Sequence, residues 1–216
     1  MVAFDRTITD YLNGPAPYKL ELGAGYHGRD GWICTDLNHA RPENRVIALD
    51  ATKPFPIPSD SFDYVYLEHM IEHVTFSDAQ RMLSECHRVL KSNGVVRVAT
   101  PSLGFLQRIL SSDRSAFEEK YRAWSVRTFI PDAPNVTNAF FLNNFMRAWG
   151  HTFVFDRETL ELALRIAGFQ EITLCDGLNS SQHKHLCGLA NCDRLPAGYL
   201  ELESMVIEGT KRRTVD

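Results

Sequence analysis

The chain has 216 residues, and its 23 Lys and Arg against 27 Asp and Glu give a formal net charge of -4 with neutral histidines. This mildly acidic balance disfavours a nucleic-acid backbone as the main partner. The 44% of hydrophobic residues can form a full core, and no stretch approaches the roughly 20 apolar residues of a membrane span. We therefore expect one cytoplasmic domain over residues 1–216, without a membrane partner, acting alone or as a homodimer.

Short apolar runs alternate with helical patterns along the first hundred residues, which is typical of a parallel α/β sheet. Strands are predicted at residues 18–22, 32–36, 45–49, 62–67, 95–99, 171–175 and 204–208. An amphipathic helix is predicted from an N-cap at Ser77 to a stop at Gly94, and another from an N-cap at Asp156 to Gly168.

The connection between the first two predicted strands is unusually short. Only residues 26–31 separate the glycines from Trp32, whereas parallel neighbours usually need a crossover of a dozen residues or more. Six extended residues span about 20 Å, which is just enough to return along a strand of about 17 Å. We predict that the usual crossover helix is missing here.

Residues 102–149 do not follow the alternation of strands and helices. They contain Pro131, Pro134 and a concentration of aromatic residues, including Trp124, Phe141 and Trp149. We interpret this stretch as a helical, aromatic insertion after the fifth strand. It is either a helical hairpin that extends the core or a lid over the substrate.

The strongest functional signal is Glu21-Leu22-Gly23-Ala24-Gly25, directly after a strand. Glycines permit positive φ and let a ligand approach the backbone. Asp36 and Asp50 come at or near the ends of the next two strands, where a carboxylate can bind ribose hydroxyls or reach an adenine amino group. Asp36 follows Gly23 by only 13 residues, which leaves no room for the helix that an NAD pyrophosphate requires.

Together these segments resemble the class I S-adenosylmethionine-dependent methyltransferases, in particular the methyltransferase type 11 group. The resemblance rests on Leu20 to Gly25, Gly31 to Asp36, Leu49 to Ala51, Phe62 to Val74, Leu90 to Gly94, Gly150-His151 and Phe155 to Phe169. It implies a Rossmann-like, seven-stranded, mostly parallel sheet of order 3-2-1-4-5-7-6, with an antiparallel seventh strand and helices on both faces.

The resemblance also implies S-adenosylmethionine as the cofactor, with S-adenosylhomocysteine as its product. The methyl donor would lie over the glycines, with Glu21 at its methionine end, Asp36 at its ribose and Asp50 at its adenine. Residues at the end of the fourth strand would lie near the sulfonium. The implied cofactor-binding residues are Glu21, Gly23, Ala24, Gly25, Asp36, Leu37, Asp50, Ala51, Leu67, Glu68 and His73.

Histidines are the candidate general bases on the acceptor side. His151 precedes the last predicted helix and adjoins the aromatic insertion. His69 and His73 lie four residues apart and would share a helical face. We assign catalytic roles to His151 and His69. The alternative is that His69 and His73, with Glu72, only order a short helix after the fourth strand.

A metal site is considered at one further segment. His183, His185, Cys187 and Cys192 offer four potential zinc ligands, but their spacing is not that of a standard zinc motif. We therefore assign no metal to this sequence.

We predict an S-adenosylmethionine-dependent methyltransferase that acts on a small-molecule acceptor. Two alternatives stay open. Glu68, where relatives commonly have a small polar residue, could mark a non-methylating use of the same donor, such as cyclisation. The chain could also be a donor-binding partner subunit without turnover of its own.

Overall fold

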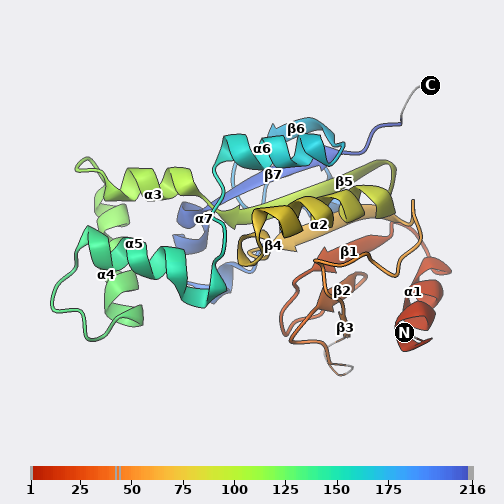
Figure 1. The fold of residues 1–216 in the computed structure, drawn as a ribbon, viewed down its shortest axis with the longest axis horizontal. Helices are drawn as coiled ribbons and strands as arrows, with labels where there is room; N and C mark the ends of the chain where they lie inside the picture. Colours follow the sequence, from red (N-terminus) through yellow and green to blue (C-terminus); the bar gives the residue numbers. More distant parts are fainter. Residues whose placement is uncertain (1, 42, 44, 214–216) are drawn as a thin grey trace.

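The computed structural model describes residues 2–41, 43 and 45–213, and a seven-stranded sheet forms the centre of this part of the chain (Figure 1). The strands are β1 (Lys19–Leu22), β2 (Ile33–Asp36), β3 (Val46–Ala48), β4 (Phe62–Glu68), β5 (Leu90–Pro101), β6 (Gln170–Leu174) and β7 (Ser204–Thr210). Their order is β3-β2-β1-β4-β5-β7-β6, which confirms the predicted topology.

Helices and short 3-10 turns surround the sheet. The helices are α1 (Val2–Leu12), α2 (Phe76–Val89), α3 (Leu103–Leu110), α4 (Ala116–Phe129), α5 (Asn138–Arg147), α6 (Arg157–Ile166) and α7 (Tyr199–Glu203). The 3-10 turns are η2 (Ile71–His73), η3 (Ala148–Gly150), η4 (Lys184–Leu186) and η5 (Cys192–Arg194). Among the described residues, no helix is long and apolar enough to cross a membrane.

The strands that matter for function are parallel and adjacent. β1 pairs in parallel with β2 and with β4, so that Leu22 lies beside Thr35 on one side and Leu67 on the other. β7 runs antiparallel to both β5 and β6, as predicted. The strand order reverses direction between β1 and β4, and ligands of open α/β sheets bind at the carboxyl edge near such a point.

Helices α2 and α6 pack on one face of the sheet and form the largest apolar cluster with β1, β4 and β5 (Figure 1). α2 begins after Thr75, whose hydroxyl accepts a backbone N–H, so the predicted N-cap at Ser77 was wrong. Gly94 does not end this helix either. The N–H of Leu90 makes the last helical hydrogen bond, to the carbonyl of Cys86, while the extended backbone of Leu90 already pairs with Phe62 as the first residue of β5.

The opposite face is covered by the long connection between β6 and β7. Leu186 packs there with Trp32 and Tyr66, and Leu178 packs against Ala99. Between β1 and β2 no helix forms in the described residues 23–32, which confirms that prediction. The connection between β6 and β7 thus occupies a face that a crossover helix after β1 would otherwise cover.

Buried Arg97 of β5 attaches this connection to the sheet. Its side chain is fully buried, and it forms an ion pair with Glu208 of β7. It also donates hydrogen bonds to the backbone carbonyls of Leu178 and Ser180, the latter at 2.8 Å. One cation therefore joins two strands and the start of the connection.

Residues 102–149 form helices α3, α4 and α5, which extend beyond one end of the sheet (Figure 1). They enclose an apolar cluster of their own that includes Phe105, Tyr121, Phe141 and Phe145. Each helix begins at a hydroxyl side chain that accepts a backbone N–H, and α4 has a complete capping box at Ser115.

The N-terminal helix α1 was not predicted from the sequence. Its Ile8 is buried in the main cluster. The hydroxyl of Tyr11 donates to the carbonyl of Gly31 at 2.9 Å and accepts the N–H of Lys19 at 2.9 Å. α1 therefore supports both β1 and the short link to β2.

Candidate functional site

The turn after β1 has two glycines with different surroundings. Both have positive φ, +71° at Gly23 and +61° at Gly25. A Cβ at Gly23 would lie only 2.4 Å from Cγ of Met70, whereas a Cβ at Gly25 would meet no atom within 4 Å. Gly23 therefore permits close packing against the end of β4, and Gly25 borders open space at the edge of the sheet.

Asp36, the last residue of β2, is joined to this turn. Its Oδ2 accepts the backbone N–H of Gly25 at 3.0 Å. Its Oδ1 accepts the backbone N–H groups of Asn38 and His39 at 2.8 and 2.9 Å. The carboxylate is thus held rigidly at the carboxyl edge of the sheet, beside the open space at Gly25.

Two apolar side chains near Asp36 are exposed to solvent. Leu37 directly follows it and is 59% exposed, and Tyr26 is 54% exposed with its ring 4.1 Å from that of His39. Exposed apolar groups around a fixed carboxylate suit a nucleoside, whose base is planar and whose sugar carries hydroxyls.

Asp50 lies beyond the end of β3 and caps the turn that follows. Its Oδ1 accepts hydrogen bonds from the backbone N–H and the hydroxyl of Thr52 at 2.9 and 2.6 Å, and these bonds lower the pKa of the carboxyl. The neighbouring Ala51 is buried in the main cluster. Asp50 therefore has a structural role in addition to the implied contact with adenine.

Glu21 points to the face of β1 that the connection between β6 and β7 covers. Its carboxylate accepts two hydrogen bonds from Arg29, at 3.1 and 3.2 Å, and Arg29 also donates to the carbonyl of Leu189 at 2.9 Å. The pair of Glu21 and Arg29 therefore joins β1 to the link after it and to the connection between β6 and β7.

The end of β4 places successive side chains on opposite faces. Leu67 is fully buried in the main cluster, so only its backbone faces the edge of the sheet. Glu68 accepts hydrogen bonds from the hydroxyl of Tyr66 at 3.1 Å and the backbone N–H of Asn191 at 3.0 Å. Glu68 thus ties β4 to the connection between β6 and β7.

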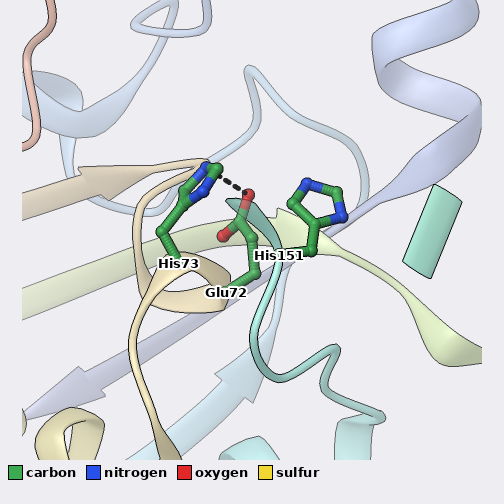
Figure 2. Close-up of side chains that lie close together, drawn as sticks. All are labelled: Glu72, His73 and His151. Carbon is green, nitrogen blue, oxygen red and sulfur yellow. Dashed lines mark ion pairs between the residues drawn. The ribbon is translucent and has the colours of Figure 1, made fainter. Parts of the chain in front are cut away.

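A carboxylate and two imidazoles meet directly after β4, and we call Glu72, His73 and His151 the Glu72 cluster (Figure 2). Figure 2 shows the carboxylate of Glu72 between the two imidazole rings. Nε2 of His73 lies 3.9 Å from Oε1 of Glu72, and the two imidazole centroids are 5.3 Å apart. The backbone brings these residues together, because the carbonyl of Glu72 accepts the N–H groups of Thr152 and Phe153.

His69 adjoins the cluster in a strained conformation. Its φ is +48°, which a non-glycine residue rarely adopts. Its Nδ1 lies 3.4 Å from Oε1 of Glu72, and its Nε2 is 2.7 Å from the hydroxyl of Ser204. The expectation that His69 and His73 share a helical face was wrong, because the helix is a single 3-10 turn that begins at Ile71.

Burial controls the electrostatics of this region. It raises the pKa of Glu72 to about 8 and lowers the pKa values of His69, His73 and His151 below their ordinary value. Nearby Glu203 also raises the pKa of Glu72, and its own pKa is raised by burial to about 7.

The sequence analysis missed the importance of Glu72, which it treated only as part of a helix turn. The pattern His69-x-x-Glu72-His73 was the available signal, but the partner His151 comes from a distant segment. The other group of metal-binding side chains considered, at residues 183–192, is not brought together. Within the described part of the chain, the metal-binding side chains that do come together are those of the Glu72 cluster, whose ligand atoms lie within 4.8 Å of one another.

Comparisons with known proteins agree with this arrangement. A family model described as a methyltransferase domain matches residues 33–98. A search of curated proteins found no match. Among solved structures, a SAM-dependent methyltransferase from Archaeoglobus fulgidus is 17% identical, with 97% of this chain and 92% of that chain covered and a TM-score of 0.55.

A second solved structure is a SAM-dependent methyltransferase, possible histamine N-methyltransferase, from Thermotoga maritima. It is 20% identical, with 97% of this chain and 95% of that chain covered and a TM-score of 0.52. At these identities the solved structures establish the fold. The chain therefore has the fold of the class I S-adenosylmethionine-dependent methyltransferases. The match to the family model supports the resemblance that the sequence motifs indicated, and with it S-adenosylmethionine as the cofactor.

Proposed function

We propose that this protein transfers a methyl group from S-adenosylmethionine to a small-molecule acceptor. The observation that carries the proposal is the rigid contact between Asp36 and Gly25 at the carboxyl edge of the sheet, beside open space and two exposed apolar side chains. The residues present fit the donor, because a Cβ-free backbone position, a fixed carboxylate and apolar surface suit an adenosyl group.

In this proposal the carboxyl edge binds the nucleoside part of the donor. Asp36 accepts hydrogen bonds from the ribose hydroxyls, and Leu37 and Tyr26 provide apolar contacts for the adenine. Gly25 leaves the space in front of the turn free for the methionine part, and Gly23 lets the turn pack against Met70. The pair of Glu21 and Arg29 holds the link after β1 in place. The bound donor supplies a carbon already activated by a sulfonium, so positioning of the acceptor provides much of the rate.

The acceptor is proposed to enter between the end of β4 and the helical insertion. His151 contacts Phe145 and Trp149 there, with ring centroids 5.8 and 5.7 Å apart. Trp149 is 49% exposed, so this entrance offers aromatic surface to a ligand. These contacts favour the lid role for residues 102–149 and an acceptor with some apolar or ring surface.

The cyclisation alternative was motivated by Glu68, which stands where relatives commonly have a small polar residue and adds a negative charge near the expected sulfonium. Both of its oxygens instead accept hydrogen bonds that fix the connection between β6 and β7. Methyl transfer is therefore the function that we retain.

The test is product analysis by mass spectrometry with a panel of small hydroxyl and amine compounds that carry rings. When the panel contains a compound that serves as methyl acceptor, we expect S-adenosylhomocysteine and the methylated compound to form in equal amounts. Donor binding without product for any acceptor class would favour the partner-subunit alternative and contradict the proposal.

A further inference from the structure

One oxygen of Glu72 is buried without a hydrogen bond. The side chain is completely buried, and its Oε2 accepts the hydroxyl of Thr100 at 3.0 Å. Its Oε1 makes no hydrogen bond in the structure. A buried polar atom without a hydrogen bond costs free energy, so such an atom in a native site calls for a partner, and a bound cation would be one.

Three imidazoles lie near this oxygen. Nδ1 of His69 is 3.4 Å from it, while Nε2 of His69 contacts the hydroxyl of Ser204, and the other two imidazoles belong to the Glu72 cluster. One ligand atom from each of Glu72, His73 and His151 lies within 4.8 Å of the others. Nδ1 of His151 lies 2.7 Å from the carbonyl of Phe145 and must donate to it, because a carbonyl only accepts. This contact leaves Nε2 of His151 unprotonated and able to bind a cation.

The orienting contacts around these ligands are already in place. Metal-binding histidines usually donate their second ring N–H to a carbonyl or carboxylate, and metal-binding carboxylates are themselves hydrogen-bonded. His151 has the first kind of contact, through Phe145, and Glu72 has the second, through Thr100. The side chain of His73 is 37% exposed, so it can adjust its position and the cluster is open to solvent.

We propose that the Glu72 cluster binds a divalent transition-metal cation such as Zn²⁺, through one carboxylate oxygen and two imidazole nitrogens. Two histidines and a carboxylate are a ligand set of catalytic zinc sites, which keep a further position for water or substrate. Tetrahedral ligands about 2.0–2.1 Å from zinc lie roughly 3.3 Å apart, so binding requires the three side chains to close slightly.

If the proposed methyl transfer is correct, the open position of the metal takes the acceptor. A hydroxyl or other oxygen bound to the cation loses its proton more easily and is held near the donor. In this arrangement His151 is a metal ligand and not the general base that the sequence indicated, because both roles would use Nε2.

The experiment is a calorimetric titration of Zn²⁺ into protein freed of metal with a chelator, together with the visible absorption of bound Co²⁺. We expect one ion per chain in the wild type. In Glu72→Gln and His151→Ala the affinity falls by more than about 100-fold, because even the loss of an outer contact costs roughly 10–100-fold. Thr100→Val, which removes only the orienting hydroxyl, should weaken binding by about 10-fold.

The double variant Cys187→Ser with Cys192→Ser is the matched control and should bind Zn²⁺ like the wild type. Circular dichroism checks that each variant is folded, and if Glu72→Gln does not fold, the Thr100→Val and Co²⁺ results decide. Absence of Zn²⁺ binding in the wild type, or equal binding in wild type and in folded His151→Ala, would overturn the proposal. S-adenosylhomocysteine is titrated into the same samples, so failure of donor binding is seen separately from failure of metal binding.

Discussion

Oδ2 of Asp36 accepts the backbone N–H of Gly25 at 3.0 Å, and this one contact joins the end of β2 to the turn after β1. The link between the two strands contains no helix, so the carboxylate approaches the glycine turn directly. Oδ1 of Asp36 already accepts two backbone N–H groups, so Oδ2, which contacts the turn at Gly25, is the oxygen with capacity left for a ligand. The geometry of donor binding in our proposal depends on this pair.

The first prediction concerns the charge of Asp36. Asp36→Asn keeps the size of the side chain but removes the charged acceptor, and hydrogen bonds to charged groups contribute about 1.5–3 kcal/mol. We expect the affinity for S-adenosylhomocysteine, measured by calorimetry, to fall by roughly 10–100-fold. Asp30→Asn, which changes an exposed carboxylate paired only with Arg45, is the control and should not alter the affinity.

The second prediction separates backbone strain from ligand space at Gly25. Gly25 and Gly188 have φ of +61° and +66°, and a Cβ at either would meet no atom within 4 Å. Replacement by alanine should cost each about 1–2 kcal/mol in the free energy of unfolding. Only Gly25→Ala should weaken binding of S-adenosylhomocysteine, since its methyl group would project into the proposed donor space. Equal affinities in the two variants would argue against that placement.

The third prediction concerns the buried ion pair between β5 and β7. Arg97→Met would leave Glu208 and the carbonyls of Leu178 and Ser180 without their cation. Breaking a buried pair by removing one partner costs about 3–5 kcal/mol, which urea unfolding would measure. Arg157→Met, which removes an exposed pair with Glu161, should change stability by less than about 1 kcal/mol. Similar losses in the two variants would contradict the structural role of Arg97.

The fourth prediction is a pH dependence of stability that comes from Glu203. Burial raises its pKa from 4.5 to about 7, although the hydroxyl of Tyr121 donates to its Oε2. The native state therefore holds a proton that the unfolded state releases, and stability should fall as the pH rises from about 4.5 to about 7. The loss is on the order of 3 kcal/mol.

Glu203→Gln isolates this contribution, because the amide is neutral and can still accept the hydroxyl of Tyr121. At acidic pH, where Glu203 is protonated and neutral, the unfolding free energies of wild type and variant should differ least. As the pH rises, the wild type should lose stability relative to the variant, and the difference should be constant above about pH 7. Urea unfolding at several pH values provides the measurement. A difference that does not vary with pH would show that Glu203 titrates as an ordinary exposed carboxyl.

The strand segments and the missing helix could be predicted because they follow from local signals, whereas the order of the strands was implied by the resemblance to a known family. Apolar runs mark the strands, and six residues after Gly25 cannot contain a crossover helix. The ends of α2 could not be predicted as well. Thr75 and Ser77 are both good caps, and only the pairing of Leu90 with Phe62 decides where helix gives way to strand.

The candidate site was predictable only where neighbours in sequence are also neighbours in space. Gly25 lies in the turn after β1 and Asp36 ends the adjacent β2, so their proximity follows from the sheet. Glu72 and His151 are far apart in the chain, and they meet because the carbonyl of Glu72 accepts two backbone N–H groups from the segment after His151. A sequence pattern carries no information about that contact.

The account as a whole depends on donor binding at the carboxyl edge of the sheet, and titration of S-adenosylhomocysteine into the wild-type protein tests it most directly. We predict saturable binding of one molecule per chain that Asp36→Asn and Gly25→Ala both weaken. Absence of binding for both S-adenosylmethionine and S-adenosylhomocysteine, by calorimetry and by equilibrium dialysis, would contradict the account.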